Sequence, residues 1–191
     1  MIKDLILKNR SYRRFYQDIP IPLENLKEFI NMARMSASAR NMQSLKYVIS
    51  NSPGMNEQVY SCLAWAGYLK DWPGPEEGER PSAYIVMLND KSLTDNYFCD
   101  DGIAAQSILL SAVEKEYGGC ILASVQRKKL AEILSLDDRF EIIQVIALGK
   151  PKEKVVLEEV KDDGDIKYWR DADGVHHVPK RKLEDIILKS L

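Results

Sequence analysis

The chain lacks any apolar run long enough to cross a bilayer, and it begins with no recognisable targeting segment. Its longest apolar stretches, at 82–88 and 141–149, are strand-sized, whereas a membrane-spanning helix needs roughly 20 consecutive apolar residues. The first residues read MIKDLILKNRS, which places charges where a secretory signal needs an uninterrupted apolar region. We therefore expect no membrane association and a cytoplasmic location.

Cysteine and histidine are scarce, with three cysteines and two histidines in 191 residues. Cys62, Cys99 and Cys120 form no CxxC pair and leave one over from any disulfide scheme, which favours a reducing compartment. His176 and His177 are adjacent, so their side chains diverge on a strand and lie about 100° apart on a helix. We expect no metal site, and we interpret the two histidines as solvated loop residues.

An excess of positive charge is also absent, because 27 lysines and arginines face 29 aspartates and glutamates. A protein that binds a nucleic-acid backbone needs a basic face over many phosphates, and no RNA-binding motif with interleaved aromatics occurs. We therefore expect no nucleic-acid partner. The length and the 45% apolar content are typical of a globular protein, and no repeat or domain boundary is apparent. Residues 1–191 are predicted to form a single domain.

The spacing of apolar residues predicts alternating helices and strands. Helices are expected where apolar residues recur at helical spacing, at 1–9, 23–33, 53–66, 102–119, 126–136 and 181–191. Strands are expected in β-rich apolar stretches, at 45–50, 82–89, 118–124 and 141–149. The helix at 102–119 is apolar nearly all round until Glu114, so we expect it in the core or against another subunit. The segment DWPGPEEGER at 71–80 is the clearest loop, and 152–175 is predicted to be a polar, extended excursion.

The stretch NRSYRRF at 9–15 concentrates positive charge in an otherwise slightly acidic chain. Arg10, Ser11, Arg13 and Arg14 lie where a helix is expected to end and a turn to begin. Their donors are therefore suited to converge on one compact anion such as a phosphate. The alternative is a solvated, arginine-rich turn with a few ion pairs, and these residues alone leave both interpretations open.

A second polar cluster precedes the strand expected at 45–50. The side chains of Ser38, Asn41 and Gln43 both donate and accept hydrogen bonds. An amide suits the edge of a heterocycle that alternates carbonyl and N–H groups, because one amide satisfies both kinds. Serine and asparagine also favour turns and helix ends, so a purely structural turn is the alternative interpretation.

Four segments, in order and spanning nearly the whole chain, resemble the nitroreductase-like flavoproteins that bind FMN. NRSYRRF is similar to the family's R-R-S-x-R-x-F, with Asn9 in place of the first arginine, and SARNMQSLKYVIS is similar to S-x-x-N-x-Q-P-W followed by a strand. DDGIAAQSILLSAVEKEYGGCIL resembles the central helix that runs into G-L-G-x-C, and IIQVIALGKPKE resembles the strand that ends in A-L-G-x-P. The chain departs from the family at Ser44 and Leu45, which stand where Pro-Trp is usual, and at YGG 117–119, which replaces Gly-Leu-Gly.

The resemblance implies an α+β fold of three layers. A mainly antiparallel central sheet would be flanked by helices, and two protomers would interlock as a homodimer with FMN at the interface. It also implies that the flavin phosphate is held at the NRSYRRF turn, that glycines let the backbone approach the ring, and that a late basic pair closes on the phosphate. The implied cofactor-binding residues are Arg10, Ser11, Arg13, Ser38, Arg40, Asn41, Gln43, Gly118, Gly119, Cys120, Lys180 and Arg181.

The same resemblance implies an FMN-dependent oxidoreductase with NAD(P)H as electron donor. NAD(P)H would reduce the flavin and leave, and a nitroaromatic, quinone or similar planar acceptor would then be reduced in the second half of a ping-pong cycle. The flavin performs the chemistry, so no catalytic acid, base or metal is implied. The alternative is a flavin-binding, sensing or storage protein without NAD(P)H turnover. The departure from Pro-Trp beside the flavin and the acidic 71–80 loop, which would repel an anionic nucleotide, favour that alternative.

Three aromatic residues lead into the 71–80 loop, and their role is open between two interpretations. Trp65, Tyr68 and Trp72 either stack on a planar acceptor or simply pack the end of a helix.

Overall fold

The computed structural model of the protein describes residues 1–191 and divides into two compact units. The first unit comprises Met1–Trp65 and Gly74–Lys152, and the second comprises Ala66–Pro73 and Glu153–Leu191. The prediction of a single domain over 1–191 stays a prediction. None of the helices is long and apolar enough to cross a membrane.

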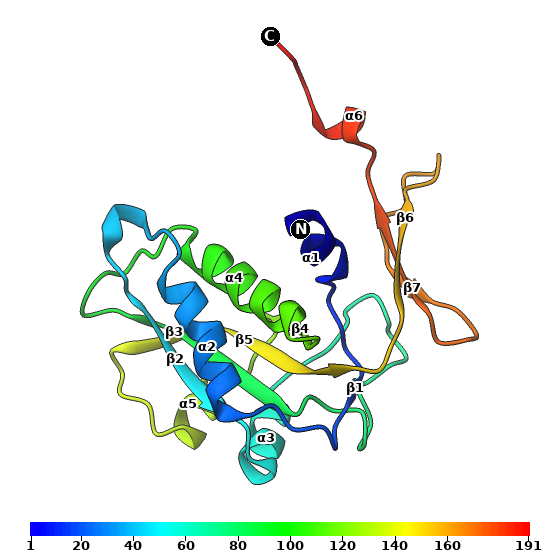
Figure 1. Cartoon of the computed structure of the whole chain (residues 1–191). Coiled ribbons are helices and arrows are strands. Elements are labelled where there is room, and N and C mark those ends of the chain that lie inside the picture. Colours follow the sequence, from blue (N-terminus) through cyan, green and yellow to red (C-terminus); the bar gives the residue numbers. More distant parts are fainter. The chain divides into compact units, whose positions relative to one another are not determined.

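The first unit is built on an antiparallel sheet whose longest strand is β5 (Figure 1). One edge of β5 pairs with β3, which in turn pairs with β2, and the other edge pairs with β4 and β1. The strands are β1 (Phe15–Tyr16), β2 (Leu45–Ser50), β3 (Ala83–Asp90), β4 (Gly118–Leu122) and β5 (Phe140–Pro151). The four strands expected from the sequence are therefore confirmed, and the two-residue β1 was not anticipated.

Strand β3 lies in the middle of the sheet and is buried along its whole length. It pairs with β2 through contacts such as Val86↔Val48 and with β5 through Val86↔Val145. Because successive side chains of a strand point to opposite faces, the apolar run at 83–88 requires cover on both sides. Helices provide that cover on each face.

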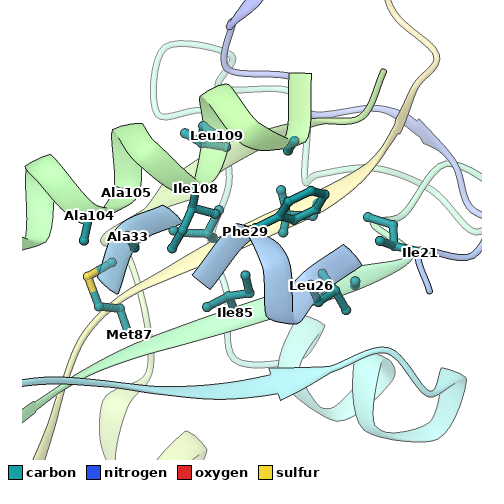
Figure 2. Packing of buried hydrophobic residues seen from close by; sticks show 14 of the residues in the cluster. Ile21, Leu26, Phe29, Ala33, Ile85, Met87, Ala104, Ala105, Ile108 and Leu109 are labelled. Carbon is teal, nitrogen blue, oxygen red and sulfur yellow. The ribbon is translucent and has the colours of Figure 1, made fainter. Parts of the chain in front are cut away.

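On one face, α2 (Leu23–Arg34) and α4 (Asp100–Glu114) pack against each other and the sheet (Figure 1). Figure 2 shows the apolar cluster between them, where Leu26 and Phe29 of α2 meet Ile108 of α4 and Ile85 of β3. All four side chains are almost completely buried. Burying side chains of this size stabilises the fold by about 1.5–3 kcal/mol each, so this cluster is a main source of stability.

The other face of the sheet is covered by α3 (Pro53–Tyr60) and α5 (Arg127–Ile133), which contribute the buried Val59 and Leu130. The first unit is thus a three-layer α+β arrangement of helices, antiparallel sheet and helices, as the resemblance implied. The N-terminal helix, α1 (Ile2–Lys8), also forms as predicted, but none of its residues is buried.

Four helices predicted from the sequence end earlier than expected. Helix α4 ends at Glu114 rather than near 119, and α5 ends at Ile133 rather than near 136. Helix α3 ends at Tyr60 rather than near Ala66, because Leu63 leaves the helix to form an isolated bridge with Val125. The predicted helix at 181–191 is reduced to the single turn α6 (Leu183–Ile186). Its apolar residues stay exposed, so no tertiary packing supports a longer helix.

The second unit contains a three-stranded sheet in the order β6-β8-β7. Strand β6 (Val155–Glu159) pairs in parallel with β8 (His176–Lys180), which pairs antiparallel with β7 (Trp169–Arg170). The segment 152–175, predicted to be a polar excursion, therefore supplies two of these strands.

The interpretation of both histidines as solvated loop residues was wrong. His176 and His177 begin β8; His176 is 1% exposed, and the His177 ring stacks on the Trp169 ring at 4.1 Å. The His177 Nδ1 lies 2.5 Å from Glu158 Oε1, and its Nε2 lies 3.0 Å from Asp171 Oδ2. Hydrogen bonds to Asp171 and Glu158 raise the pKa of His177, so this histidine is part of an ion-paired cluster.

Candidate flavin site

The turn after α1 places Arg10 and Ser11 directly beside strand β4. Ser11 forms an isolated bridge with Gly119, and the Tyr12 N–H donates to the Gly119 carbonyl at 3.0 Å. Arg10 Nη2 donates to the Ile6 carbonyl at 2.5 Å, which anchors the guanidinium to the last turn of α1. The Arg10 Nε is buried and has no hydrogen-bond partner in the chain. A buried charged donor without an acceptor fits an anionic group bound at this turn.

The arginines of this turn have different surroundings. Arg13 is 9% exposed, and its Nη1 donates to the Ser11 carbonyl at 3.2 Å, which helps to shape the turn. Arg14 instead forms a two-pronged ion pair with Glu79, and Lys152 Nζ lies 2.9 Å from the same carboxylate. The Arg14 guanidinium is therefore bound by the acidic 71–80 loop, and the hypothesis that its donors join those of Arg10 on an anion is not supported.

Gly118, Gly119 and Cys120 form the start of β4 and are buried. A Cβ on Gly118 would lie 2.5 Å from the Tyr12 ring, and a Cβ on Gly119 would lie 2.5 Å from the Ala147 carbonyl oxygen. Packing within the chain is therefore enough to explain why both positions are glycine. The suggested approach of their backbone to a flavin ring stays a prediction.

The loop that carries Ser38, Arg40, Asn41 and Gln43 has an unusual backbone. The φ angles of Arg40, Asn41 and Gln43 are 52°, 54° and 51°, in the left-handed region that most side chains avoid. Gln43 Nε2 donates to the Asn41 carbonyl at 3.2 Å, and the Arg40 guanidinium carbon lies 5.8 Å from the centre of the Phe98 ring. Arg40, Asn41 and Gln43 are exposed, so their side chains are accessible to a bound molecule.

Asp100, a residue that the sequence analysis did not single out, holds this loop in place. Its carboxylate accepts a hydrogen bond from Ser38 Oγ at 2.7 Å and one from the Ala39 N–H at 2.8 Å. Ser38 Oγ in turn accepts a bond from the Gln43 N–H at 3.0 Å. The hydroxyl of Ser38 therefore organises the loop from within. The only signal in the sequence is the acidic pair that begins α4, and it does not reveal a partner 62 positions away.

A cavity of about 210 Å³ opens beside this loop. Ser38, Gln43, Leu45, Tyr47 and Asp100 are among the residues that line it. Burial, together with the negative charge of Asp100, raises the pKa of Tyr47 to about 12, so its phenol stays protonated at neutral pH. The cavity therefore offers both apolar surface and hydrogen-bonding groups to a small molecule.

Helix α4 connects the two groups of candidate residues. Near the arginine turn, Asn9 Nδ2 donates to Gln106 Oε1 of α4 at 3.2 Å. Near the loop at 38–43, called the amide loop below, the Asp100 carboxylate of the same helix binds Ser38. Ser36 and Ser107 share a hydrogen bond of 2.7 Å. Both groups thus lie along one helix of the first unit.

Lys180 and Arg181 belong to the second unit. Lys180 ends β8, where its carbonyl accepts a bond from the Val160 N–H, and Arg181 follows it; both side chains are exposed. Their part in binding a phosphate stays a prediction.

Trp65, Tyr68 and Trp72 all contact other parts of the chain. Trp65 is buried beside Tyr60, with ring centres 6.0 Å apart. Within the second unit, the Tyr68 ring lies 4.9 Å from the Tyr168 ring, and the Arg170 guanidinium lies 4.7 Å from the Trp72 ring. Trp65 therefore packs near the end of α3, as the simpler interpretation held.

Comparison with known proteins identifies the family. The sequence profile of the Nitroreductase family matches residues 6–150, about three quarters of the chain, so the protein belongs to this family. The protein MhqN of Bacillus subtilis (strain 168) is 22% identical over 180 residues, covering 78% of this chain and 87% of MhqN.

Solved structures show the same fold. The FMN-dependent nitroreductase of Clostridium difficile R20291 superimposes with a TM-score of 0.65 at 22% identity, covering 81% of this chain and 89% of that one. The NADPH:FMN oxidoreductase of Vibrio harveyi, solved with NAD+, gives a TM-score of 0.62 at 22% identity, covering 78% of this chain and 68% of that one.

Proposed function

We propose that the protein is an FMN-dependent oxidoreductase that takes electrons from NAD(P)H and reduces a planar acceptor such as a nitroaromatic or a quinone. The observation that carries the proposal is the buried, unpartnered Arg10 Nε in a turn that lies against Gly119. Membership of the Nitroreductase family supports it, as do neighbours named for FMN and for NADPH.

Each group of candidate residues has a distinct task in this proposal. Arg10 and Ser11 bind the FMN phosphate, and Arg13 supports the turn that presents them. The loop around Asn41 and Gln43 offers amides to the polar edge of the ring, in a backbone conformation that Asp100 maintains. The role of Lys180 and Arg181 as a further source of positive charge for the phosphate stays a prediction.

FMN, when bound, supplies the hydride chemistry, so the protein needs no acid or base of its own. The chain's residues bind the phosphate, orient the ring and leave one face open for the nucleotide and the acceptor in turn. That backbone N–H groups at 118–120 donate to the polar edge of the ring stays a prediction, because β5 pairs with one edge of this strand and Ser11 bridges the other. Positive charge from Arg13 or Arg40 would favour a reduced, anionic ring.

A homodimer is part of the proposal, because α1 presents an apolar surface that the chain does not cover. Ile2, Ile6 and Leu7 are 62%, 46% and 50% exposed, and no residue of this helix is buried. Large side chains so exposed on one short helix indicate a protein interface.

The decisive experiment is anaerobic stopped-flow spectroscopy of the FMN-loaded protein. We expect NADH or NADPH to bleach the flavin absorbance, and a quinone or nitroaromatic to restore it over repeated cycles. A protein that neither carries FMN when purified nor binds added FMN would refute the proposed site altogether.

The second candidate function is a flavin-binding protein without NAD(P)H turnover. Ser44 stands where the family usually has proline. It is 1% exposed, and its Oγ has no hydrogen-bond partner in the chain. The residue next to Gln43, beside the candidate ring site, therefore differs from the family pattern. This alternative predicts that dithionite reduces the bound flavin whereas neither nucleotide does.

A further inference from the structure

A second cavity, of about 150 Å³, lies at the start of β3, among residues not assigned to the candidate flavin site. Arg80, Ser82 and Tyr84 line it from the segment that enters β3, and Tyr60 lines it from α3. Arg80 and Ser82 lie in the bends just before β3 and Tyr84 is the second residue of the strand, so one short stretch of chain brings all three side chains to the cavity.

Each of these three side chains has a buried polar atom without a hydrogen-bond partner in the chain: Arg80 Nε, Ser82 Oγ and Tyr84 Oη. Tyr84 is completely buried and Ser82 is 6% exposed. Burial raises the pKa of Tyr84, so its phenol remains a donor at neutral pH. Because buried polar groups in folded proteins are nearly always hydrogen-bonded, three such atoms at one cavity indicate a missing acceptor.

The cavity wall is held rigidly by its neighbours. Arg80 Nη1 donates to Glu57 Oε2 at 2.5 Å, and the Arg80 guanidinium lies 4.2 Å from the centre of the Tyr60 ring. Asn56 Nδ2 donates to the Ser82 carbonyl at 2.8 Å, which ties α3 to the start of β3. The donors are therefore fixed in position before any ligand binds, which lowers the entropic cost of binding.

Charge and size define the class of ligand. Glu57 and Arg80 are the charged residues of the lining, and they pair with each other, so the cavity is neutral. Three prolines and the Tyr60 ring add apolar surface. A cavity of this volume is large enough for one benzene-sized ring.

We propose that this cavity is a second small-molecule site, which binds a neutral single-ring compound through a carbonyl or carboxamide oxygen. Tyr84 Oη and Arg80 Nε donate to the two lone pairs of that oxygen, and Ser82 Oγ accepts from the N–H of a carboxamide. The site does not depend on the proposed flavin chemistry, because it shares no residue with the cavity beside the amide loop.

The test is a titration of the full-length protein with benzamide, followed by amide chemical shifts in ¹H–¹⁵N NMR spectra. We expect saturable shift changes at 80–84 and 56–60, with toluene, which has no acceptor, and benzoate, which is charged, binding more weakly. Absence of saturation, or shift changes confined to 38–47, would overturn the proposal.

The variant Tyr84→Phe separates a binding role from a structural one. It should weaken benzamide binding about five- to tenfold, as expected for loss of one neutral hydrogen bond. It should also raise Tm by about 2–4 °C, because an unsatisfied buried hydroxyl is removed. The matched control is Tyr16→Phe, which removes an exposed hydroxyl and should change neither quantity. If Tyr84→Phe instead lowers Tm and leaves benzamide affinity unchanged, ordered water satisfies these donors and the cavity is not a ligand site.

Discussion

The three arginines of the turn at 9–15 are chemically identical but have different roles. Arg10 keeps a buried donor without a partner, Arg13 is buried within the turn, and Arg14 is bound by Glu79. Substitution of Arg13 removes packing as well as charge, so Arg10 gives the cleaner test of phosphate binding.

The variant Arg10→Ala should weaken FMN binding about 10- to 100-fold, because a charge-assisted contact contributes roughly 1.5–3 kcal/mol. The free energy of unfolding of the apoprotein should change by less than about 1 kcal/mol. FMN affinity is measured by fluorescence quenching and stability by urea denaturation. Lys8→Ala, at the exposed end of α1 two residues before Arg10, is the control and should retain wild-type affinity. Equal affinities in the two variants would favour the solvated-turn interpretation.

Glu79 makes the stability of the first unit depend on acidity. Hydrogen bonds from Arg14 and, secondarily, Lys152 lower the pKa of its carboxyl from 4.5 to about 2. A carboxyl whose pKa is lower in the folded state than in the unfolded state stabilises the folded state. The stabilisation is complete above the pKa of the unfolded state, about 4.5, and is lost as the pH falls from 4.5 towards 2.

Glu79→Gln should therefore lower the free energy of unfolding by about 1.5–3 kcal/mol at neutral pH, and the difference from wild type should shrink at about pH 3. Urea denaturation at both pH values measures it. Glu76→Gln, an exposed residue of the same loop, should be neutral at both. A deficit that does not depend on pH would show that the ion pair is not the cause.

At the scale of elements, β4 is packed so closely that its glycines admit no side chain. The Cβ of an alanine at 119 would meet a backbone oxygen of the neighbouring strand β5, which cannot move without breaking the sheet register. Gly54 in α3, by contrast, has open space around its Cα.

The two glycines should respond to alanine in opposite ways. Gly119→Ala should cost about 1–3 kcal/mol of folding free energy through overpacking. Gly54→Ala should raise stability by about 0.5–1 kcal/mol, because alanine loses less conformational entropy in a helix. Chemical denaturation measures both. A neutral Gly119→Ala would mean that β4 can shift enough to relieve the 2.5 Å approach of the added Cβ to the Ala147 oxygen.

At the scale of the whole molecule, the proposed homodimer depends on the apolar surface of α1. Ile6→Asp should convert the dimer to a monomer in light scattering coupled to size-exclusion chromatography, because a buried charge at an interface is strongly unfavourable. Lys3→Asp alters an exposed polar position of the same helix and should leave the dimer intact. A monomeric wild-type protein, or a dimeric Ile6→Asp variant, would contradict this interface.

The sequence by itself determined the main strands, four helices and the family, because apolar periodicity and short motifs are local patterns that each segment carries alone. It predicted the C-terminal helix wrongly, since periodicity does not reveal whether a packing partner exists.

Only the tertiary structure decided which charged and polar groups meet. Asp100 holds the Ser38 loop from 62 positions away, and Glu79 binds Arg14 from 65 positions away. The cavity at Tyr84 likewise joins segments that are distant in sequence. Such contacts depend on how the layers pack, because ion pairs and buried hydrogen bonds form wherever folding brings donors and acceptors together. No local pattern along the chain records that geometry.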